Sequence, residues 1–179
     1  MQELLTFGHG TATADRIVEL LRGAEIRTLV DVRTAPGSRH NPHVARDRLA
    51  EWLPEHGIGY RWDKRLGGWR KARPDSPDSA LRSRAFSGYA AHMRSPEFRA
   101  AIEDLITSQE RTAIMCAESV WWRCHRRMIA DFLVLATNTP VLHLLHDGRL
   151  HEHIPSDIAR KRADGLLVYD GGQPDLWEY

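Results

Sequence analysis

Cysteine is scarce in this chain of 179 residues, which contains only Cys116 and Cys124. Two cysteines are too few for the disulfide framework of a small secreted domain. We therefore expect a protein of the reducing cytoplasm. Both cysteines fall within one short stretch, "MCAESVWWRCHRRMIADFL" over residues 115–133, so the role of that stretch is the first question the sequence poses.

Long apolar runs are also absent, because a charged residue interrupts them every few positions. This pattern excludes a membrane-spanning segment and predicts no contact with a membrane. The first ten residues, "MQELLTFGHG", lack the basic start and the long apolar stretch of a secretory signal. With 42% hydrophobic and 27% charged residues, the composition is that of a globular protein. We expect one domain over residues 1–179, with residues 145–179 as a C-terminal extension packed on it.

Lysine is rare as well, since Lys64, Lys71 and Lys161 are the only lysines among 25 basic residues. The 25 basic residues face 24 acidic ones, so the bias lies in residue type and not in net charge. Genome composition is one explanation for the excess of arginine. The other is recognition of phosphate or carboxylate groups, for which the planar, bidentate guanidinium is suited.

Stretches with strand character alternate along the chain with stretches of helical periodicity. Strands are predicted over residues 4–9, 27–33, 58–62, 111–116 and 140–145, and helices over residues 13–24, 42–57, 95–109 and 124–136. This alternation predicts an α/β fold: a single three-layer domain with a mainly parallel central sheet of about five strands, flanked by helices. Near the C-terminus, "SDIARKRA" favours a short capped helix, and the remainder a hairpin or tail that packs Leu166, Val168 and Trp177.

Polar residues and glycine gather at the carboxyl ends of the predicted strands, where an open parallel sheet binds its ligands. Loops are generally rich in such residues, but here arginine, histidine and glycine recur at nearly every end. They are His9 and Gly10 after the first strand, Arg33 and Ser38 after the second, Gly67 and Gly68 after the third, Cys116 and Glu118 at the fourth, and His143 and His146 at the fifth.

The stretch with both cysteines is predicted to form the end of a strand, a loop "AESVWWR" and a helix that begins at Cys124. A helix N-terminus presents free N–H groups and a partial positive charge, to which Arg123, His125 and Arg126 would add. The arrangement predicts an anion-binding site and a lowered pKa for the thiol of Cys124.

Several alternatives exist for the two cysteines. A disulfide between them is sterically feasible but disfavoured in a reducing compartment, and a metal site on Cys116, Cys124, His125 and His9 would have an eight-residue spacing that matches no compact zinc motif. A phosphatase-type loop needs five residues between cysteine and arginine, whereas six separate Cys116 from Arg123. A persulfide-forming loop agrees with the architecture alone. We favour a structural Cys116 that ends a buried strand, and a different role for Cys124 in a positive field.

Three more polar side chains of this edge are candidates for chemistry. Glu118 would repel an anion bound beside it, so it is predicted to pair with Arg123 or Arg126, or to act as a general acid or base. His125 and His9 are candidate proton carriers, alongside structural roles for each.

Residues 61–84 form a basic segment, with eight Lys or Arg against three Asp, and Trp62 and Trp69 are interleaved with them. This combination suits a stacked base beside a phosphate backbone, or a nucleotide. The alternative is a solvated loop whose tryptophans pack onto the core. His151 and His153, in "HEH", have no third ligand nearby and are weak as a metal motif.

An ordered series of motifs over residues 5–153 resembles the domain-of-unknown-function 488 family of bacterial and archaeal proteins. The motifs are "TFGHG", "VDVRTAPGSRH", "GIGYRWDKRLGG", "MCAESVWWRCHR" and "VLHLLHDGRLHEH", and Gly10 stands where the family pattern usually has serine. The resemblance implies a compact α/β fold and a functional edge, but no particular reaction. The site residues that it implies are His9, Arg33, Ser38, Gly67, Gly68, Cys116, Glu118, Cys124, His125 and Arg126.

Two functions follow as hypotheses. The first is an enzyme that binds a phosphorylated, nucleotide-like or nucleic-acid substrate, with Glu118, Cys124 and His125 as catalytic residues. Its anion would be held by the remaining site residues, namely His9, Arg33, Ser38, Gly67, Gly68, Cys116, Arg123 and Arg126. The second is a non-catalytic nucleic-acid-binding or nucleotide-sensing module that uses residues 61–84. Neither hypothesis calls for a cofactor or a metal, and the partner expected is an anionic small molecule or a nucleic acid.

Overall fold

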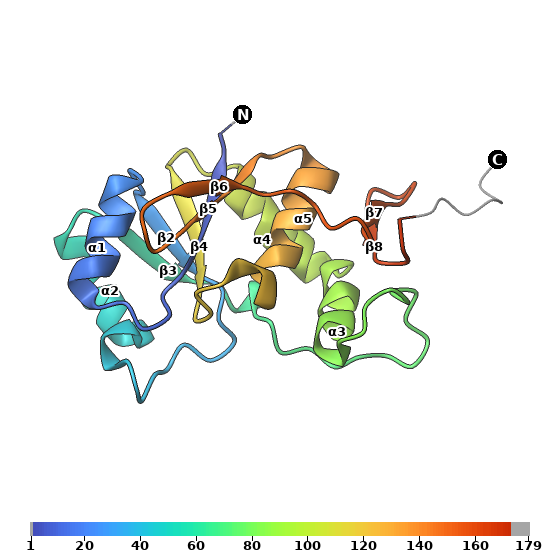
Figure 1. Ribbon diagram of the computed structural model, residues 1–179, viewed down its shortest axis with the longest axis horizontal. Coiled ribbons are helices and arrows are strands. Elements are labelled where there is room, and N and C mark those ends of the chain that lie inside the picture. The colour runs from blue at the N-terminus through green and yellow to red at the C-terminus, as the bar shows by residue number, and fades with distance from the viewer. Residues whose placement is uncertain (1, 173–179) are drawn as a thin grey trace.

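The computed structural model of the protein describes residues 2–172, in which a central sheet of six strands has helices on both faces (Figure 1). The strands are β1 (Leu4–Gly8), β2 (Thr28–Asp31), β3 (Gly59–Trp62), β4 (Thr112–Cys116), β5 (Val141–Leu144) and β6 (Leu150–Glu152). Their order is β3-β2-β4-β1-β5-β6, and only β6 runs antiparallel to its neighbour. The predicted α/β class and mainly parallel sheet are confirmed, with one strand more than expected.

Helices form the two outer layers of the domain. They are α1 (Ala14–Gly23), α2 (Arg46–Glu55), α3 (Arg84–Met93), α4 (Pro96–Ile106) and α5 (Arg126–Thr137), with 3₁₀ turns η1 (Pro42–Val44), η2 (Lys64–Leu66) and η3 (Trp121–Arg123). Helices α1 and α2 pack against Leu5, Phe7 and Met115 of the sheet, and α3, α4 and α5 pack against Val30 and Ile114 on the other face. Because successive residues of a strand point to opposite faces, strands covered on both sides are apolar throughout.

Side-chain caps mark where three of these helices begin. The hydroxyls of Thr13, Ser83 and Ser95 accept hydrogen bonds from backbone N–H groups three residues further on. Ser95 with Pro96 starts α4 as predicted. Pro54 lies in the last turn of α2, which ends one residue later, so the expected stop is close to its predicted place.

Some element predictions were wrong. The predicted helix over residues 42–57 is divided at Ala45, which is extended, into η1 and α2. The helix predicted to start at Cys124 begins at Arg126, after η3. Helix α3 was not predicted, because Gly88 lowers its apparent helical character. A Cβ at Gly88 would lie 2.3 Å from the carbonyl oxygen of Arg70, so the close contact with the preceding segment explains that glycine.

The C-terminal segment forms a small hairpin of β7 (Arg160–Lys161) and β8 (Leu167–Val168). The short helix expected in "SDIARKRA" is therefore wrong. A turn that contains Gly165 at φ +83° joins the two strands, and Val168 and Tyr169 are buried against the helical layer. The hairpin expectation is confirmed, whereas Trp177 lies outside the described residues. Across residues 2–172, no helix has both the length and the apolar character needed to cross a bilayer.

Candidate thiol site at the carboxyl edge of the sheet

The carboxyl ends of β1, β2 and β4 lie side by side, because β4 is hydrogen-bonded between the other two strands. A cavity of about 830 Å³ opens at this edge. The predicted site residues that line it are His9, Arg33, Ser38, Gly68, Cys116, Glu118, Arg123, Cys124 and His125. Gly67 and Arg126 are buried next to this lining and are not part of it.

The two cysteines meet at this cavity. Cys116 is the last residue of β4 and Cys124 lies between η3 and α5, yet their Sγ atoms are only 2.6 Å apart. Both are free thiols and both are buried. The intervening loop, residues 117–123, folds back and brings the two sulfurs together, a proximity that was not predicted from the sequence.

Close packing holds this loop against the end of β1. A Cβ at Gly8 would lie 1.8 Å from the carbonyl oxygen of Glu118, so only glycine fits there. At the other end of the loop, the indole of Trp121 stacks on the imidazole of His143 with centroids 4.1 Å apart and an interplanar angle of 3°. The position of Cys124 is thus set from both ends of the loop.

The two thiols differ in their tendency to ionise. Burial disfavours the thiolate of Cys124, but hydrogen bonds from Cys116 and His125, and the charges of His125 and Arg126, outweigh burial and hold the pKa of Cys124 well below its ordinary value. The backbone N–H of Arg126 also donates to the Cys124 sulfur over 3.4 Å. Burial, together with the hydrogen bond to Cys124, raises the pKa of Cys116 well above its ordinary value. The pair therefore consists of a Cys124 thiolate and a Cys116 thiol that donates a hydrogen bond to it.

Arg126 gives an independent reason for a negative charge at this place. Its side chain is 1% exposed, and its guanidinium donates to the carbonyl of Glu118 over 2.6 Å and to the hydroxyl of Thr6 over 3.3 Å. Its Nε atom has no hydrogen-bond partner, and no carboxylate of the described residues pairs with it. Because a buried cation requires a counter-charge, the adjacent Cys124 thiolate balances Arg126.

His125 is positioned to exchange a proton with Cys124. Its Nε2 lies 2.9 Å from the carbonyl of Val32, which requires a proton on that nitrogen, and its Nδ1 lies 3.5 Å from the Cys124 sulfur. The ring packs edge-on against Tyr89, with centroids 5.1 Å apart. A Cβ at Gly68 would lie 2.7 Å from Nδ1, so this glycine allows the segment after η2 to close over the imidazole. Gly67 allows the same segment to approach Thr34, because a Cβ added at Gly67 would lie 2.6 Å from the Thr34 hydroxyl.

Arg33, predicted to bind the anion, is already engaged within the protein. Its guanidinium makes a bidentate ion pair with buried Asp31, at 2.6 and 2.8 Å, and donates to the carbonyl of Val44. Burial alone would lower the pKa of Arg33, but Asp31 raises it above the ordinary value. The remaining Nη1 lies 3.3 Å from Nε2 of His9, whose Nδ1 donates to the carbonyl of Gly10. Burial lowers the pKa of His9, which therefore stays neutral and accepts from Arg33.

The rim of the cavity carries the exposed charges. Arg123 is exposed and makes no ion pair with the described residues, so its guanidinium is available to a ligand. Glu118 is exposed too, and it pairs with neither Arg123 nor Arg126 in this part of the chain. Its backbone carbonyl, rather than its carboxylate, holds Arg126, which corrects the predicted ion pair. The hydroxyl of Ser38 accepts from the N–H of Asn41 and so shapes the loop after β2.

A buried polar chain behind the site was not predicted from the sequence. It leads from the Thr6 hydroxyl to Nδ1 of His143 over 2.6 Å, from Nε2 of His143 to Nδ1 of His153 over 2.9 Å, and from His153 to the carboxylate of Asp131 over 2.8 Å. Tyr169 also donates to Asp131. The sequence signals of this chain were the "HEH" motif and His143 of the fifth predicted strand. His153 serves here as a hydrogen-bonding residue, and no group of three or more His, Cys, Asp or Glu among the described residues is placed to hold a metal ion.

The basic segment 61–84 uses three of its eight cations and one of its tryptophans in intramolecular contacts. Arg61 and Arg65 pair with buried Asp63, Arg70 donates to backbone carbonyls, and the Trp62 indole donates to the carbonyl of Arg33. This outcome agrees with the alternative of a loop that packs back onto the core. Lys71, Arg73, Arg82 and Arg84 stay exposed, and Trp69 is 78% exposed at the cavity.

Comparison with known proteins gives one family. The family described as "Domain of unknown function DUF488" matches residues 13–133, which include both cysteines and the loop between them. No match was found among curated proteins or among solved structures. The matched region covers more than half of the sequence and agrees with the resemblance drawn from its motifs. The chain belongs to the DUF488 family of domains of unknown function.

Proposed function

We propose that this protein is an enzyme in which the Cys124 thiolate attacks an anionic substrate bound in the cavity at the carboxyl edge of the sheet. The observation that carries this proposal is the environment of the Cys124 sulfur. It lines the cavity and accepts the backbone N–H of Arg126, beside a buried guanidinium that has no carboxylate partner within residues 2–172. A thiolate held in a positive field is the reactive form of cysteine.

The surrounding side chains supply the other functions that such a reaction requires. Arg123 offers a free guanidinium to a phosphate or carboxylate, and the exposed indole of Trp69 offers a face on which a base could stack. These two features favour a phosphorylated or nucleotide-like substrate. His125 holds the proton that a leaving group takes up, and Glu118 at the rim is a second acid or base.

The nucleophile is tested by alkylation with iodoacetamide, followed by mass spectrometry of the peptides. At about pH 6, where an ordinary thiol is largely protonated, Cys124 should react well before Cys116. Inorganic phosphate or a nucleoside monophosphate should slow the reaction, and R123A should lose this protection. Equal reactivity of the two cysteines, or reaction only at about pH 8 and above, would show that Cys124 is no activated nucleophile.

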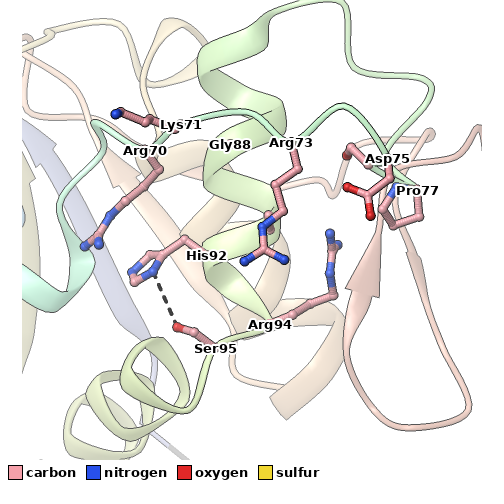
Figure 2. A pocket seen from close by; sticks show the side chains of 11 residues that line it. Arg70, Lys71, Arg73, Asp75, Pro77, Gly88, His92, Arg94 and Ser95 are labelled. Carbon is pink, nitrogen blue, oxygen red and sulfur yellow. Dashed lines mark hydrogen bonds between the residues drawn. The ribbon is translucent and has the colours of Figure 1, made fainter.

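A second candidate function is binding of nucleic acid without catalysis, through the exposed cations of the basic segment. Figure 2 shows Arg73 pointing toward His92 and Arg94 in a pocket of about 560 Å³ between residues 70–77 and α3. Arg94 is already paired with buried Asp78, but Lys71 and Arg73 are exposed and form no ion pair within the described residues. Unpaired cations beside a groove favour a phosphate backbone.

This second function predicts salt-dependent binding of single-stranded nucleic acid. The variant K71A/R73A/R84A should weaken binding and reduce its salt dependence, since each phosphate contact contributes to the slope. A variant with the same change of charge elsewhere, R48A/R99A/R149A, is the matched control. Equal loss in both variants would indicate a general charge effect and would contradict a site on this segment. For either function we propose the reducing cytoplasm as the compartment, because free thiols persist there.

A further inference from the structure

We propose that Cys116 and Cys124 form a dithiol–disulfide couple, in which Cys124 attacks a small anionic disulfide and Cys116 resolves the mixed disulfide that results. This inference rests on the proposed nucleophile Cys124 and specifies the substrate class and the reaction. Its basis is the 2.6 Å contact between the two sulfurs at the cavity. A disulfide bond of about 2.05 Å requires the sulfurs to approach by only roughly another 0.5 Å.

The environments of the two sulfurs assign them different roles. Cys124 has the donors expected around an attacking thiolate, namely the backbone N–H of Arg126, the imidazole of His125 and the thiol of Cys116. The hydrogen-bond partners of Cys116 among the described residues are the Cys124 sulfur and the Glu118 carbonyl, which suits a thiol that keeps its proton until the second step. The order of events follows, with Cys124 first and Cys116 second.

The proposed reaction balances without any further reactant. The Cys124 thiolate attacks one sulfur of the substrate R–S–S–R′, forms a protein–S–S–R bond and releases R′S⁻. The Cys116 sulfur then attacks Cys124, breaks that mixed disulfide and releases R–S⁻, while the proton of Cys116 passes to one of the two departing thiolates. The products are a Cys116–Cys124 disulfide, one thiol and one thiolate. An external dithiol reductant returns the protein to its starting state by the reverse exchange.

The position of the sulfurs indicates a small substrate rather than a protein. Cys116 and Cys124 are 3% and 7% exposed, so a disulfide within a folded protein could not reach them, whereas the cavity of about 830 Å³ admits a small molecule. Arg123, on its rim, forms no ion pair with any residue that the structure describes. These features together favour a low-molecular-weight disulfide that carries carboxylate or phosphate groups.

The reduced protein can be tested with the dianionic disulfide of thionitrobenzoate, which releases a coloured thiolate. Wild type should release two equivalents per chain and end as an intramolecular disulfide without an adduct. C116S should release one equivalent and retain one thionitrobenzoate, observed by mass spectrometry. V120A, which changes a side chain of the same loop that does not line the cavity, is the matched control and should behave as wild type. C116A, with its fold checked by circular dichroism, replaces C116S if the serine variant does not fold.

The outcomes separate this inference from the function on which it rests. If wild type retains the adduct and releases one equivalent, Cys116 does not resolve and the inference is overturned, while Cys124 remains the proposed nucleophile. If C116S and C116A form no adduct at Cys124, the nucleophile itself is refuted. The substrate class is tested by comparing the rates at which two disulfides oxidise the protein, each divided by its rate with a free thiol in solution. Dianionic dithiodipropionate should react about tenfold or more faster than dicationic cystamine on this scale, and R123A should reduce the ratio of the two rates. An unchanged ratio in R123A would overturn the anionic class.

Discussion

Arg126 contributes to the chemistry of the site, although it does not line the cavity. It is a buried cation whose charge helps to lower the pKa of Cys124, so each group stabilises the charge of the other. At the same time its guanidinium ties the carbonyl of Glu118 to the hydroxyl of Thr6. One side chain thereby sets both the charge of Cys124 and the path of the loop that carries it.

The first prediction concerns this charge. R126M should raise the pKa of Cys124, because it removes the cation and keeps most of the volume. At a pH below the pKa, each unit of that rise reduces the thiolate fraction up to roughly tenfold, and alkylation at such a pH should slow to the same extent. R127M is the matched control, since Arg127 is the next residue of α5 and its guanidinium lies over the ring of Phe86 of α3. Equal alkylation rates in R126M and wild type would show that the thiolate does not depend on Arg126.

At the scale of secondary-structure elements, the site depends on close contact between the end of β1 and the loop of residues 117–123. Gly8 is the contact point, because a side chain there would occupy the place of the Glu118 carbonyl. The contact is between backbones far apart in the sequence, so periodicity alone could not predict it.

The second prediction tests this contact. G8A should destabilise the fold by about 1–3 kcal/mol, the usual cost of overpacking, and should also lower the reactivity of Cys124. G23A is the matched control: Gly23 is the last residue of α1, nothing lies within 4 Å of its added Cβ, and alanine there should stabilise by about 0.5–1 kcal/mol. The free energy of unfolding in urea measures both effects. Similar stabilities of G8A and G23A would contradict the close contact.

The same contrast explains how much could be predicted from the sequence. Apolar strands and capped helices carry local signals, so β1, β2, β4, α1 and α4 were predicted close to their observed bounds. The location of the site at the carboxyl edge of the sheet was predicted from the general rule that open parallel sheets bind ligands there. The sulfur contact and the buried chain behind Trp121 depend on how a loop folds back, and α3 was missed because Gly88 serves packing rather than helix formation. Tertiary contacts of this kind produce no periodic pattern in the sequence from which they could be predicted.

At the scale of the whole molecule, stability should depend on pH through His143. Burial first, and then the charges of His153, Arg126 and His151, lower its pKa from 6.5 to about 3, and Asp131 reaches it only through His153. As pH falls below 6.5 the unfolded chain binds a proton at this residue and the folded chain does not. The free energy of unfolding therefore decreases between pH 6.5 and about 3.

The third prediction is that this dependence weakens when His143 no longer titrates. From pH 6.5 to about 4.5, the contribution of this one group is on the order of 2 kcal/mol. H143N keeps a donor and an acceptor but does not titrate in this range. Urea unfolding at several pH values compares the two proteins. Parallel stability curves for H143N and wild type would show that His143 is not the cause.

The fourth prediction is that oxidation of the cysteine pair destabilises the protein, whereas disulfides usually stabilise. Closing this short loop would stabilise by about 2–3 kcal/mol through the unfolded chain. The disulfide would also remove the counter-charge of buried Arg126, at a cost of about 3–5 kcal/mol. The disulfide form should therefore be roughly 1–2 kcal/mol less stable than the dithiol form in urea unfolding. In R126M the order should reverse, and an oxidised wild type that is the more stable form would contradict this account.

The stacked pair of Trp121 and His143 has a practical consequence. An indole in face-to-face contact with an imidazole loses fluorescence when that imidazole takes up a proton, and a nearby disulfide quenches it as well. Trp121 belongs to the loop that precedes Cys124, three residues before it, and its ring contacts the buried imidazoles of His143 and His153. The difference in emission between wild type and W121F would therefore follow both events in solution without any added dye.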